Sequence, residues 1–224
     1  MNQGPRTTAR VRNLLVAALM LACTLGTATH AVAQRISAPV TPTDITPPGG
    51  STAFLFGHGV GTQGYICLPT SVGATTAAWS ANNVRPEATL FVNFSGQQVQ
   101  IITHFLSPDE KPNANAPSPL PVGSVTWQSS FDSSKVWAQK VKTLNAGTDA
   151  SCPNSNSIAC LLLQSIGNEE GPTGGKTLAK TTYIQRLNTK GGLAPADGCV
   201  DFHDVGKQAL VQYSADYYFF RRGQ

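Results

Sequence analysis

Charge is scarce in this chain of 224 residues. Charged side chains make up 12% of it, with 16 basic against 12 acidic residues. Three of the basic residues, Arg6, Arg10 and Arg12, lie within the first 33 positions, so the remainder holds 13 basic and 12 acidic residues. A nucleic-acid-binding protein needs a clustered basic face. The nearly neutral remainder has none, which excludes nucleic acid as the main partner.

Long apolar runs and the common catalytic motifs are also missing. After the first 33 residues no apolar stretch approaches the ~20 residues of a membrane-spanning helix, so no transmembrane segment is expected. The sequence contains no G-x-S-x-G and no S-x-x-K, which argues against the nucleophile chemistries that these motifs support. It also contains no C-x-x-C, which argues against a cysteine metal site.

Two glycine-rich stretches resemble cofactor motifs but stand in the wrong context. Gly59–Gly64 spells G-x-G-x-x-G, yet it runs into the strand pattern Tyr65–Cys67 and not into a helix that could hold a pyrophosphate. We therefore predict a turn or bulge there. Gly174–Thr177 resembles a phosphate loop, but Glu170 stands where its first glycine belongs, and a carboxylate repels phosphate. No cofactor is expected.

The first 33 residues have the organisation of an export signal peptide. A basic start is followed by the apolar segment Leu14–Ala22 and by the small-x-small pattern Ala31–Ala33. We expect the mature chain to begin at Gln34 and to be periplasmic or extracellular. A lipoprotein site at Cys23 is the minor alternative, because Leu21 stands where a small residue is usual.

Four cysteines remain after the predicted signal peptide: Cys67, Cys152, Cys160 and Cys199. An even number in an exported chain indicates disulfides. Of the three possible pairings we predict Cys152–Cys160, which closes a short Pro/Asn/Ser loop, together with Cys67–Cys199. The second bridge ties the first core strand to the segment before the last strand.

The composition of the remaining chain predicts an all-β protein. About 190 residues suit one domain with a full hydrophobic core. Gly, Pro, Ser, Thr and Asn are abundant, which favours strands and turns. We expect an extended Pro-rich arm over residues 34–50 and one β domain over 51–224. That domain is predicted to be an antiparallel β-sandwich or flattened barrel with long loops and at most one or two short helices.

The expected strands follow from alternation and β-branched content. Asn93–Gly96 is a predicted turn, which makes residues 87–106 a hairpin. Five prolines predict a long loop over Ser107–Pro121. Ile158–Ile166 fits a buried strand or a short helix, and we favour the helix. The strands are predicted at Ala53–Phe56, Gln63–Cys67, Ala77–Ser80, Glu87–Asn93, Gln98–Leu106, Ser124–Gln128, Lys135–Val141, Lys176–Leu187 and Gln208–Phe220.

Two histidines carry the site hypotheses. His104 shares a strand face with Ile102 and Leu106, so it is either a partly buried structural histidine or an acid–base group paired with Glu87. His203 follows Asp201 on a predicted loop. The two residues form a weak metal-site candidate, with a solvated turn as the alternative.

Other polar and aromatic residues extend the candidate set. A polar cluster of Gln63, Glu87, His104 and Arg186 is one interpretation, and a structural Glu87–Arg186 pair between neighbouring strands is the other. Aromatic residues, with Trp127 among them, either line a groove for a sugar or another flat ligand or belong to the core. The ligand-binding candidates are Gln63, Tyr65, His104, Trp127, Gln185 and Arg186.

Several motifs taken together identify a family. They are Gly61-x-Gln63-x-Tyr65-x-Cys67, Arg85–Leu90, His104-Phe105, Tyr183–Gly192 and Tyr213–Phe219. From Ala53 to its end the chain resembles the exported DUF3455 domain, a domain of unknown function in bacteria and fungi. The family pattern has Gly-Pro-x-Trp after the histidine and Asp-Gly-Ser later. This chain has Ser107-Pro108 and Asp132-Ser133-Ser134 instead, and the resemblance implies no established activity.

These observations favour a non-catalytic extracytoplasmic binding or surface-interaction module. Its partner would be a small molecule, a glycan or a protein surface. The alternative is a hydrolase or lyase that acts on a cell-wall or sugar-like ligand with His104 and Glu87. A weaker alternative is a metal-binding exported protein that uses His203 and Asp201.

Overall fold

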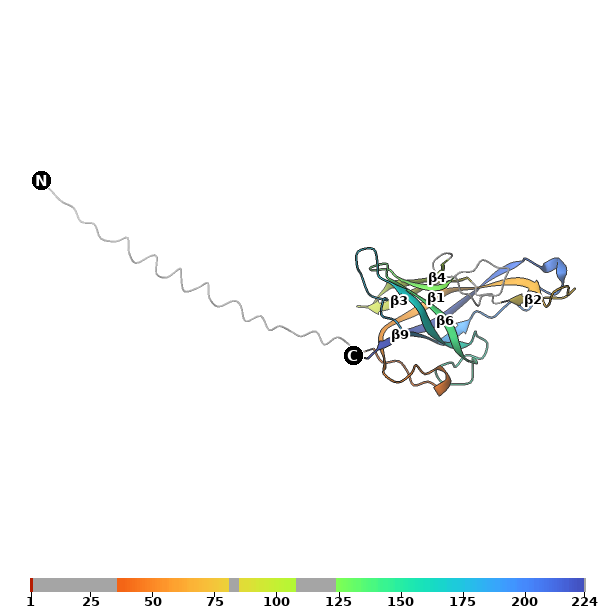
Figure 1. Cartoon of the computed structure of the whole chain (residues 1–224), viewed down its shortest axis with the longest axis horizontal. Helices are drawn as coiled ribbons and strands as arrows, with labels where there is room; N and C mark the ends of the chain where they lie inside the picture. Colours follow the sequence, from red (N-terminus) through yellow and green to blue (C-terminus); the bar gives the residue numbers. More distant parts are fainter. Residues whose placement is uncertain (2–35, 81–84, 108–123, 224) are drawn as a thin grey trace. The chain divides into compact units, whose positions relative to one another are not determined.

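The computed structural model describes Met1 and residues 36–80, 85–107 and 124–223 (Figure 1). Apart from Met1, the predicted signal peptide with Cys23 lies outside the described residues, as does most of the Pro-rich loop. Within them the chain forms two short 3-10 helices and nine strands. These elements are η1 (Thr43–Ile45), β1 (Ser51–Pro69), β2 (Ala77–Ser80), β3 (Pro86–Phe94), β4 (Gln97–Ser107), β5 (Ser124–Ser129), β6 (Lys135–Leu144), β7 (Cys160–Glu169), β8 (Tyr183–Gly191), η2 (Phe202–Asp204) and β9 (Gln208–Arg222).

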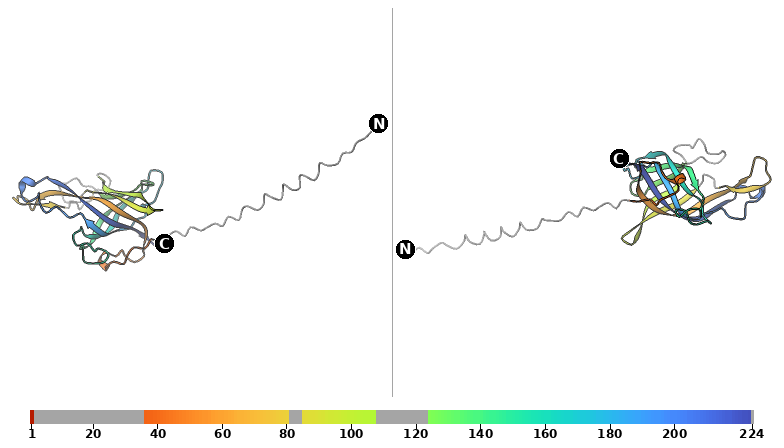
Figure 2. Two further views of the ribbon diagram at one scale, coloured as in Figure 1. Left: turned by 180° about the vertical axis from the view of Figure 1, so that it is seen from behind. Right: turned by 90° about the horizontal axis from the view of Figure 1, so that it is seen from below.

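The strands form one antiparallel sheet that closes on itself. Their order is β2-β1-β3-β4-β5-β6-β7-β8-β9, and β1 also pairs with β9 from Ser51 opposite Arg222 to Ile66 opposite Gln208. This last pairing joins β1 and β3–β9 into a ring (Figure 2). Closure leaves no open edge among these eight strands. The predicted all-β antiparallel fold is confirmed, and of its two predicted forms, a sandwich or a flattened barrel, the closed ring corresponds to the barrel.

Strand β1 unites two strands that the sequence predicts as separate. The predicted turn or bulge at Gly59–Gly64 is wrong, because these residues are extended and pair with β3 and β9. A Cβ at Gly59 would lie 2.8 Å from the Tyr217 ring, and one at Gly61 would overlap the Glu87 carbonyl oxygen. The glycines therefore let neighbouring groups approach β1 closely.

Strand β7 replaces the helix predicted at Ile158–Ile166. Leu163 belongs to the main core inside the ring and Leu161 packs against that core. Leu162 belongs to a second cluster, with Ile45 and the Cys152–Cys160 bridge. A strand covered on both faces has a continuous apolar run, and such a run has no alternation to distinguish it from a helix. The helix prediction is wrong for this reason.

The main core lies inside the ring, and the second half of β9 contributes four residues of one face to it. Tyr213, Ala215, Tyr217 and Phe219 are all buried, while the residues between them are only partly buried. This confirms the period-two pattern read from the sequence. The predicted hairpin is also present, since β3 and β4 are joined by a turn at Ser95 and Gly96.

Residues of the predicted arm pack against the outside of the ring. Ile45 in η1 is fully buried, among Cys152, Cys160, Leu162 and Leu187. The Cys152–Cys160 bridge, with its Cα atoms 6.0 Å apart, lies in the same cluster. This part of the arm is therefore anchored to the β domain.

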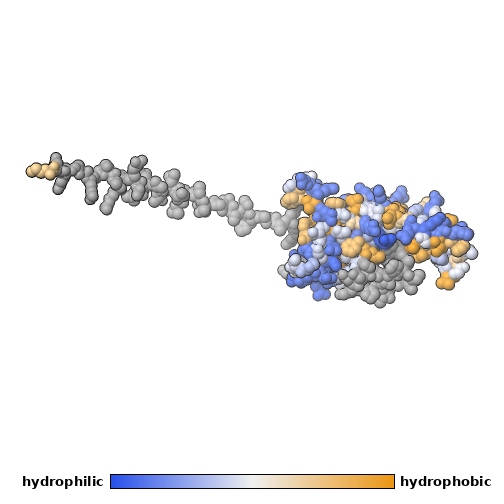
Figure 3. Space-filling model, turned by 90° about the horizontal axis from the view of Figure 1, so that it is seen from above, coloured by the Kyte–Doolittle hydropathy of each residue, from blue (hydrophilic) through white to orange (hydrophobic). Residues whose placement is uncertain are grey.

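The end of β1, together with β2, η2 and the start of β9, forms an extension of the sheet (Figure 1). Cys67 and Cys199 are bonded within it, with their Cα atoms 5.5 Å apart. Both predicted disulfides are thus confirmed, and they fit an oxidising compartment. Among the described residues no helix has the length and apolar character needed to cross a membrane. Figure 3 shows hydrophilic and hydrophobic residues interspersed over the visible face of the domain.

Candidate functional site

Four strands place aromatic and polar side chains together inside the ring. Strand β4 provides His104, β5 provides Trp127, β8 provides Arg186, and β9 provides Tyr213 and Tyr217. His104 lies opposite Trp127 in the β4–β5 register, and Arg186 lies opposite Tyr217 in the β8–β9 register. We call these five residues the interior cluster. They are the candidate functional site.

His104 is a buried member of the cluster, with 3% of its surface exposed. Its Nδ1 lies 2.8 Å from the Thr126 carbonyl oxygen. Since a carbonyl only accepts, Nδ1 carries a proton and Nε2 of the neutral ring keeps its lone pair. The imidazole stacks on the Trp127 indole with the ring centroids 4.0 Å apart and the planes 12° apart. The edge of Tyr217 lies nearby, at 5.7 Å between centroids.

The surroundings of His104 keep it neutral. Burial lowers the pKa of His104 to about 3; the hydrogen bond to Thr126 opposes this shift, and the charge of Arg186 adds to it. A group with this pKa is a weak base at neutral pH. The geometry therefore suits packing or a ligand contact better than proton transfer.

Arg186 brings a positive charge into the cluster. Its Nη2 donates to the Ala159 carbonyl at 2.9 Å, whereas its buried Nε has no hydrogen-bond partner. The indole Nε1 of Trp127, which is 1% exposed, has no partner either. None of the ion pairs found among the described residues includes Arg186. The cluster thus holds two unused donors and a cation without a carboxylate partner.

The tyrosines of β9 complete the cluster. Their hydroxyl oxygens lie 2.9 Å apart. Burial raises the pKa of Tyr213 and of Tyr217, and the Arg186 charge lowers both without overcoming burial. Both hydroxyls are therefore protonated donors at neutral pH. The sequence pattern placed these tyrosines on the inner face of their strand, but that pattern alone does not distinguish a ligand contact from core packing.

Tyr65 lies within electrostatic range of Arg186. Burial raises its pKa and Arg186 lowers it. Its hydroxyl donates to the Gly192 carbonyl at 2.5 Å, so this donor is already occupied. Of the predicted ligand-binding residues, the structure therefore brings together His104, Trp127 and Arg186, with Tyr65 within electrostatic range.

Glu87 does not join this group. Ala88 lies opposite His104 in the β3–β4 register and is buried, whereas Glu87 is exposed. Successive residues of a strand face opposite sides, so Glu87 lies outside the ring while His104 lies inside. Neither the acid–base pair of Glu87 with His104 nor the structural Glu87–Arg186 pair is formed.

Two glutamine candidates have other partners. Gln185 is 1% exposed and faces the arm, where its Nε2 donates to the Ile45 carbonyl at 2.7 Å and to Thr41 Oγ1 at 3.2 Å. Gln63 Nε2 donates to the Gly64 carbonyl at 3.3 Å. Gln185 therefore holds the arm, on the opposite face of β8 from Arg186.

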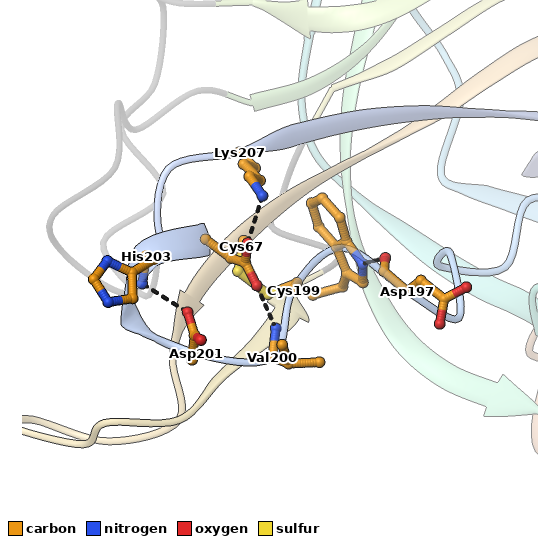
Figure 4. A network of polar contacts seen from close by, with 9 residues as sticks. Cys67, Asp197, Cys199, Val200, Asp201, His203 and Lys207 are labelled. Atoms are coloured by element: carbon orange, nitrogen blue, oxygen red, sulfur yellow. Dashed lines mark hydrogen bonds and ion pairs between the residues drawn. A yellow bond between two sulfur atoms is a disulfide. The ribbon is translucent and has the colours of Figure 1, made fainter.

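The predicted metal candidates lie in the extension (Figure 4). Asp201 Oδ1 accepts a hydrogen bond from the backbone N–H of His203 at 2.8 Å, not from its ring. The His203 ring lies against Phe202, with the centroids 4.7 Å apart. In the part of the chain that the structure describes, no three His, Cys, Asp or Glu side chains are arranged to hold a metal ion.

An outer-face contact was not anticipated from the sequence. Asp216 on β9 accepts from Asn188 Nδ2 at 3.0 Å, and its Oδ1 lies 2.7 Å from Nδ1 of His58 on β1. His58 and Asp216 are register partners. The contact links three neighbouring strands, and only the β1–β9 pairing, which the sequence does not reveal, brings the two side chains together.

A comparison with family models identifies the family of the chain. The model described as a protein of unknown function (DUF3455) matches residues 47–221. The chain belongs to the DUF3455 family. Neither the search of curated proteins nor the search of solved structures finds a match. The interior cluster of this DUF3455 domain lies wholly within the matched region, and the family description assigns no activity to it.

Proposed function

We propose that this DUF3455 domain is an exported, non-catalytic binding module that holds a small ligand at the interior cluster. One observation supports the proposal most directly. The buried Nε1 of Trp127 and Nε of Arg186 have no hydrogen-bond partner among the described residues. Leaving a buried donor unpaired costs on the order of 1–3 kcal/mol. Neither atom is exposed, so a ligand with acceptor atoms would recover this free energy by displacing the side chains that enclose the two donors.

Export is part of the same proposal. It is supported by the signal-peptide pattern of the first 33 residues and by the two disulfides. A catalytic role has less support, because His104 has no carboxylate beside it. The side chain of Glu87 would have to cross the sheet to reach it.

A ligand screen with two matched variants tests the binding function. The purified, disulfide-bonded protein would be screened by thermal shift against monosaccharides, nucleobases, amines, amides and carboxylates. Trp127→Phe removes the indole donor and keeps an aromatic ring. Trp79→Phe is the control, since Trp79 is in the extension and its Nε1 already donates to the Asp197 carbonyl at 2.9 Å.

We expect at least one class of compound to raise the unfolding temperature of the wild type and of Trp79→Phe, with a smaller shift in Trp127→Phe. The proposal is overturned if no class raises the wild-type unfolding temperature. It is also overturned if Trp127→Phe responds as fully as Trp79→Phe does.

Attachment to a protein surface through the extension is a second candidate function. Val200 and Phe202 are 64% and 62% exposed there. The loop that carries them is fixed by the Cys67–Cys199 bridge and by the Asp204 carboxylate, which accepts from Val200 N at 2.9 Å. Retention of the protein on its host cells would be measured for the wild type and for Phe202→Ser. Equal retention of both would eliminate this candidate.

A further inference from the structure

The outer face of the sheet carries two depressions that meet at Val60. The first has a volume of about 280 Å³ and lies over β1, β3 and β4. The second, of about 510 Å³, lies over β1, β8 and β9. Val60 lines both of them and is 51% exposed. We call the two depressions together the outer groove. Its other outward-facing lining residues are Glu87, Thr89, Thr103 and Phe105 in the first depression and Thr62, Lys190, Gln212 and Ser214 in the second.

The strand register arranges these side chains in rows across the sheet. Val60 lies opposite Thr89 on one side and Ser214 on the other. Thr89 in turn lies opposite Thr103, and Ser214 lies opposite Lys190. This row crosses five neighbouring strands and is roughly 19 Å long, at about 4.8 Å between strands. An elongated ligand fits this outline better than a compact one.

The polar side chains of the outer groove are available to a ligand. Within the described residues Glu87, Lys190 and Gln212 make no side-chain hydrogen bond and no ion pair. The carboxylate of Glu87 only accepts hydrogen bonds, the ammonium group of Lys190 only donates them, and the amide of Gln212 does both. The two charges have opposite signs, so the groove has no net charge. A neutral ligand with many donors and acceptors matches it.

Apolar surface accompanies these polar groups. Val60 and the partly exposed ring of Phe105 lie in the same groove. A sugar presents a C–H face, which packs on apolar and aromatic side chains, and a rim of hydroxyls, which bond to carboxylates and amides. An extended peptide, by contrast, adds its backbone to an open sheet edge, and the eight strands of the ring have none. The outer groove therefore suits a glycan better than a peptide.

We infer that the outer groove binds a linear, neutral oligosaccharide. Val60 and Phe105 pack against the faces of its sugar rings, and Glu87, Gln212 and Lys190 bond to its hydroxyls. This site lies on the opposite face of the sheet from the interior cluster. It goes beyond the function proposed for that cluster and does not depend on it.

An NMR titration of the disulfide-bonded protein tests the site through the methyl groups of Val60, which line both depressions. The probes are maltotriose, cellotriose and tri-N-acetylchitotriose, their monosaccharides, the acidic trigalacturonate, and trialanine. We expect at least one neutral trisaccharide to shift the Val60 methyl signals and to leave those of Val72, which is fully exposed in the loop before β2, unchanged. It should bind on the order of tenfold more tightly than its monosaccharide, because it reaches both depressions.

A matched pair of variants assigns the contact of Glu87. Glu87→Gln keeps the size of the side chain and removes its charge, so it should weaken trisaccharide binding by up to about tenfold, since hydrogen bonds to charged groups are the stronger ones. Glu170→Gln is the control, because Glu170 is an exposed partner of Lys176 outside both depressions. Urea unfolding of Glu87→Gln should match that of the wild type, which a merely structural role would not allow.

Three outcomes would overturn the inference. The first is that no neutral trisaccharide shifts the Val60 signals. The second is that trigalacturonate or trialanine binds more tightly than every neutral trisaccharide, which would indicate an acidic glycan or a peptide instead. The third is equal trisaccharide affinity of Glu87→Gln and Glu170→Gln. None of these results bears on the interior cluster, whose test is the response of Trp127→Phe.

Discussion

The imidazole of His104 lies parallel to the indole of Trp127, and its only hydrogen-bond donor is directed to the Thr126 backbone. A charged imidazolium in this place would face the positive guanidinium of Arg186. The histidine therefore stays neutral in the folded protein at pH values where it is protonated in the unfolded chain. The free energy of unfolding should depend on pH for this reason.

The first prediction is a loss of stability in mild acid that depends on His104. Its pKa falls from 6.5 to about 3 on folding. Between these values the unfolded chain binds more protons than the folded one, so stability falls as the pH falls. The slope from this group approaches ~1.4 kcal/mol per pH unit. Urea unfolding of the wild type and of His104→Gln between pH 7 and pH 4 measures it.

The exposed His203 provides the control for that experiment. His203→Gln should keep the wild-type slope, and His104→Gln should lose part of it. Identical slopes in all three proteins would show that folding does not lower the pKa of His104.

The second prediction concerns the space at Gly59. A Cβ there would lie 2.8 Å from Tyr217, whose ring is fully buried and cannot move aside freely. Gly59→Ala should lower the free energy of unfolding by about 1–3 kcal/mol, the usual cost of overpacking. Gly49→Ala, where nothing lies within 4 Å, should change it little. Equal stability of the two variants in thermal unfolding would contradict this account of β1.

The third prediction separates the two disulfides. Cys67–Cys199 spans 132 residues and Cys152–Cys160 spans 8. In the chain-entropy model the longer bridge contributes more, by about 2 kcal/mol. Replacing each pair by alanines and comparing urea midpoints measures this. A larger loss on removal of Cys152–Cys160 would mean that its packing beside η1 outweighs the difference in loop entropy.

The fourth prediction concerns Asp132, at the turn between β5 and β6. Its Oδ1 accepts from Ser134 N at 3.0 Å and from Ser134 Oγ at 2.7 Å, and its Oδ2 accepts from Thr177 N at 2.9 Å and from Thr177 Oγ1 at 2.7 Å. Burial raises the pKa of Asp132, but these hydrogen bonds outweigh burial and hold it well below its usual value. Asp132→Asn should therefore lower the free energy of unfolding by about 1–3 kcal/mol at pH 7.

Because the pKa of Asp132 is depressed, its stabilising effect is present above the pKa of the unfolded chain and declines as the pH falls below that value. Hydrogen exchange should show faster exchange of the Thr177 amide in Asp132→Asn. The exposed Asp197→Asn is the matched control. An unchanged exchange rate at Thr177 would show that Asp132 does not hold this segment.

The sequence predicted those parts of the fold that residues close together in the chain determine. The alternation in β9, the turn at Ser95–Gly96 and both disulfides could be read from neighbouring residues or from loop chemistry. The helix prediction for β7 failed because Leu162 is covered by η1, which lies more than a hundred positions earlier in the chain. No window of sequence contains that information.

The site could be predicted only in part, because it too depends on contacts between residues far apart in the chain. His104, Trp127 and Arg186 were candidates by residue type, but their juxtaposition depends on the order of strands around the ring. The absence of a carboxylate partner for Arg186 depends on Glu87 facing outward, which the β3–β4 register determines. Tyr213 and Tyr217 become candidates only when β8 is placed beside β9.

The pairing of Ser51 with Arg222 has a consequence for how the chain folds. The seam that closes the ring is made by the first and the last strands of the domain, so the ring cannot close before β9 has joined β1. The same adjacency predicts that a circular permutant, joined between the two ends and opened at Gly96, would fold to the same ring.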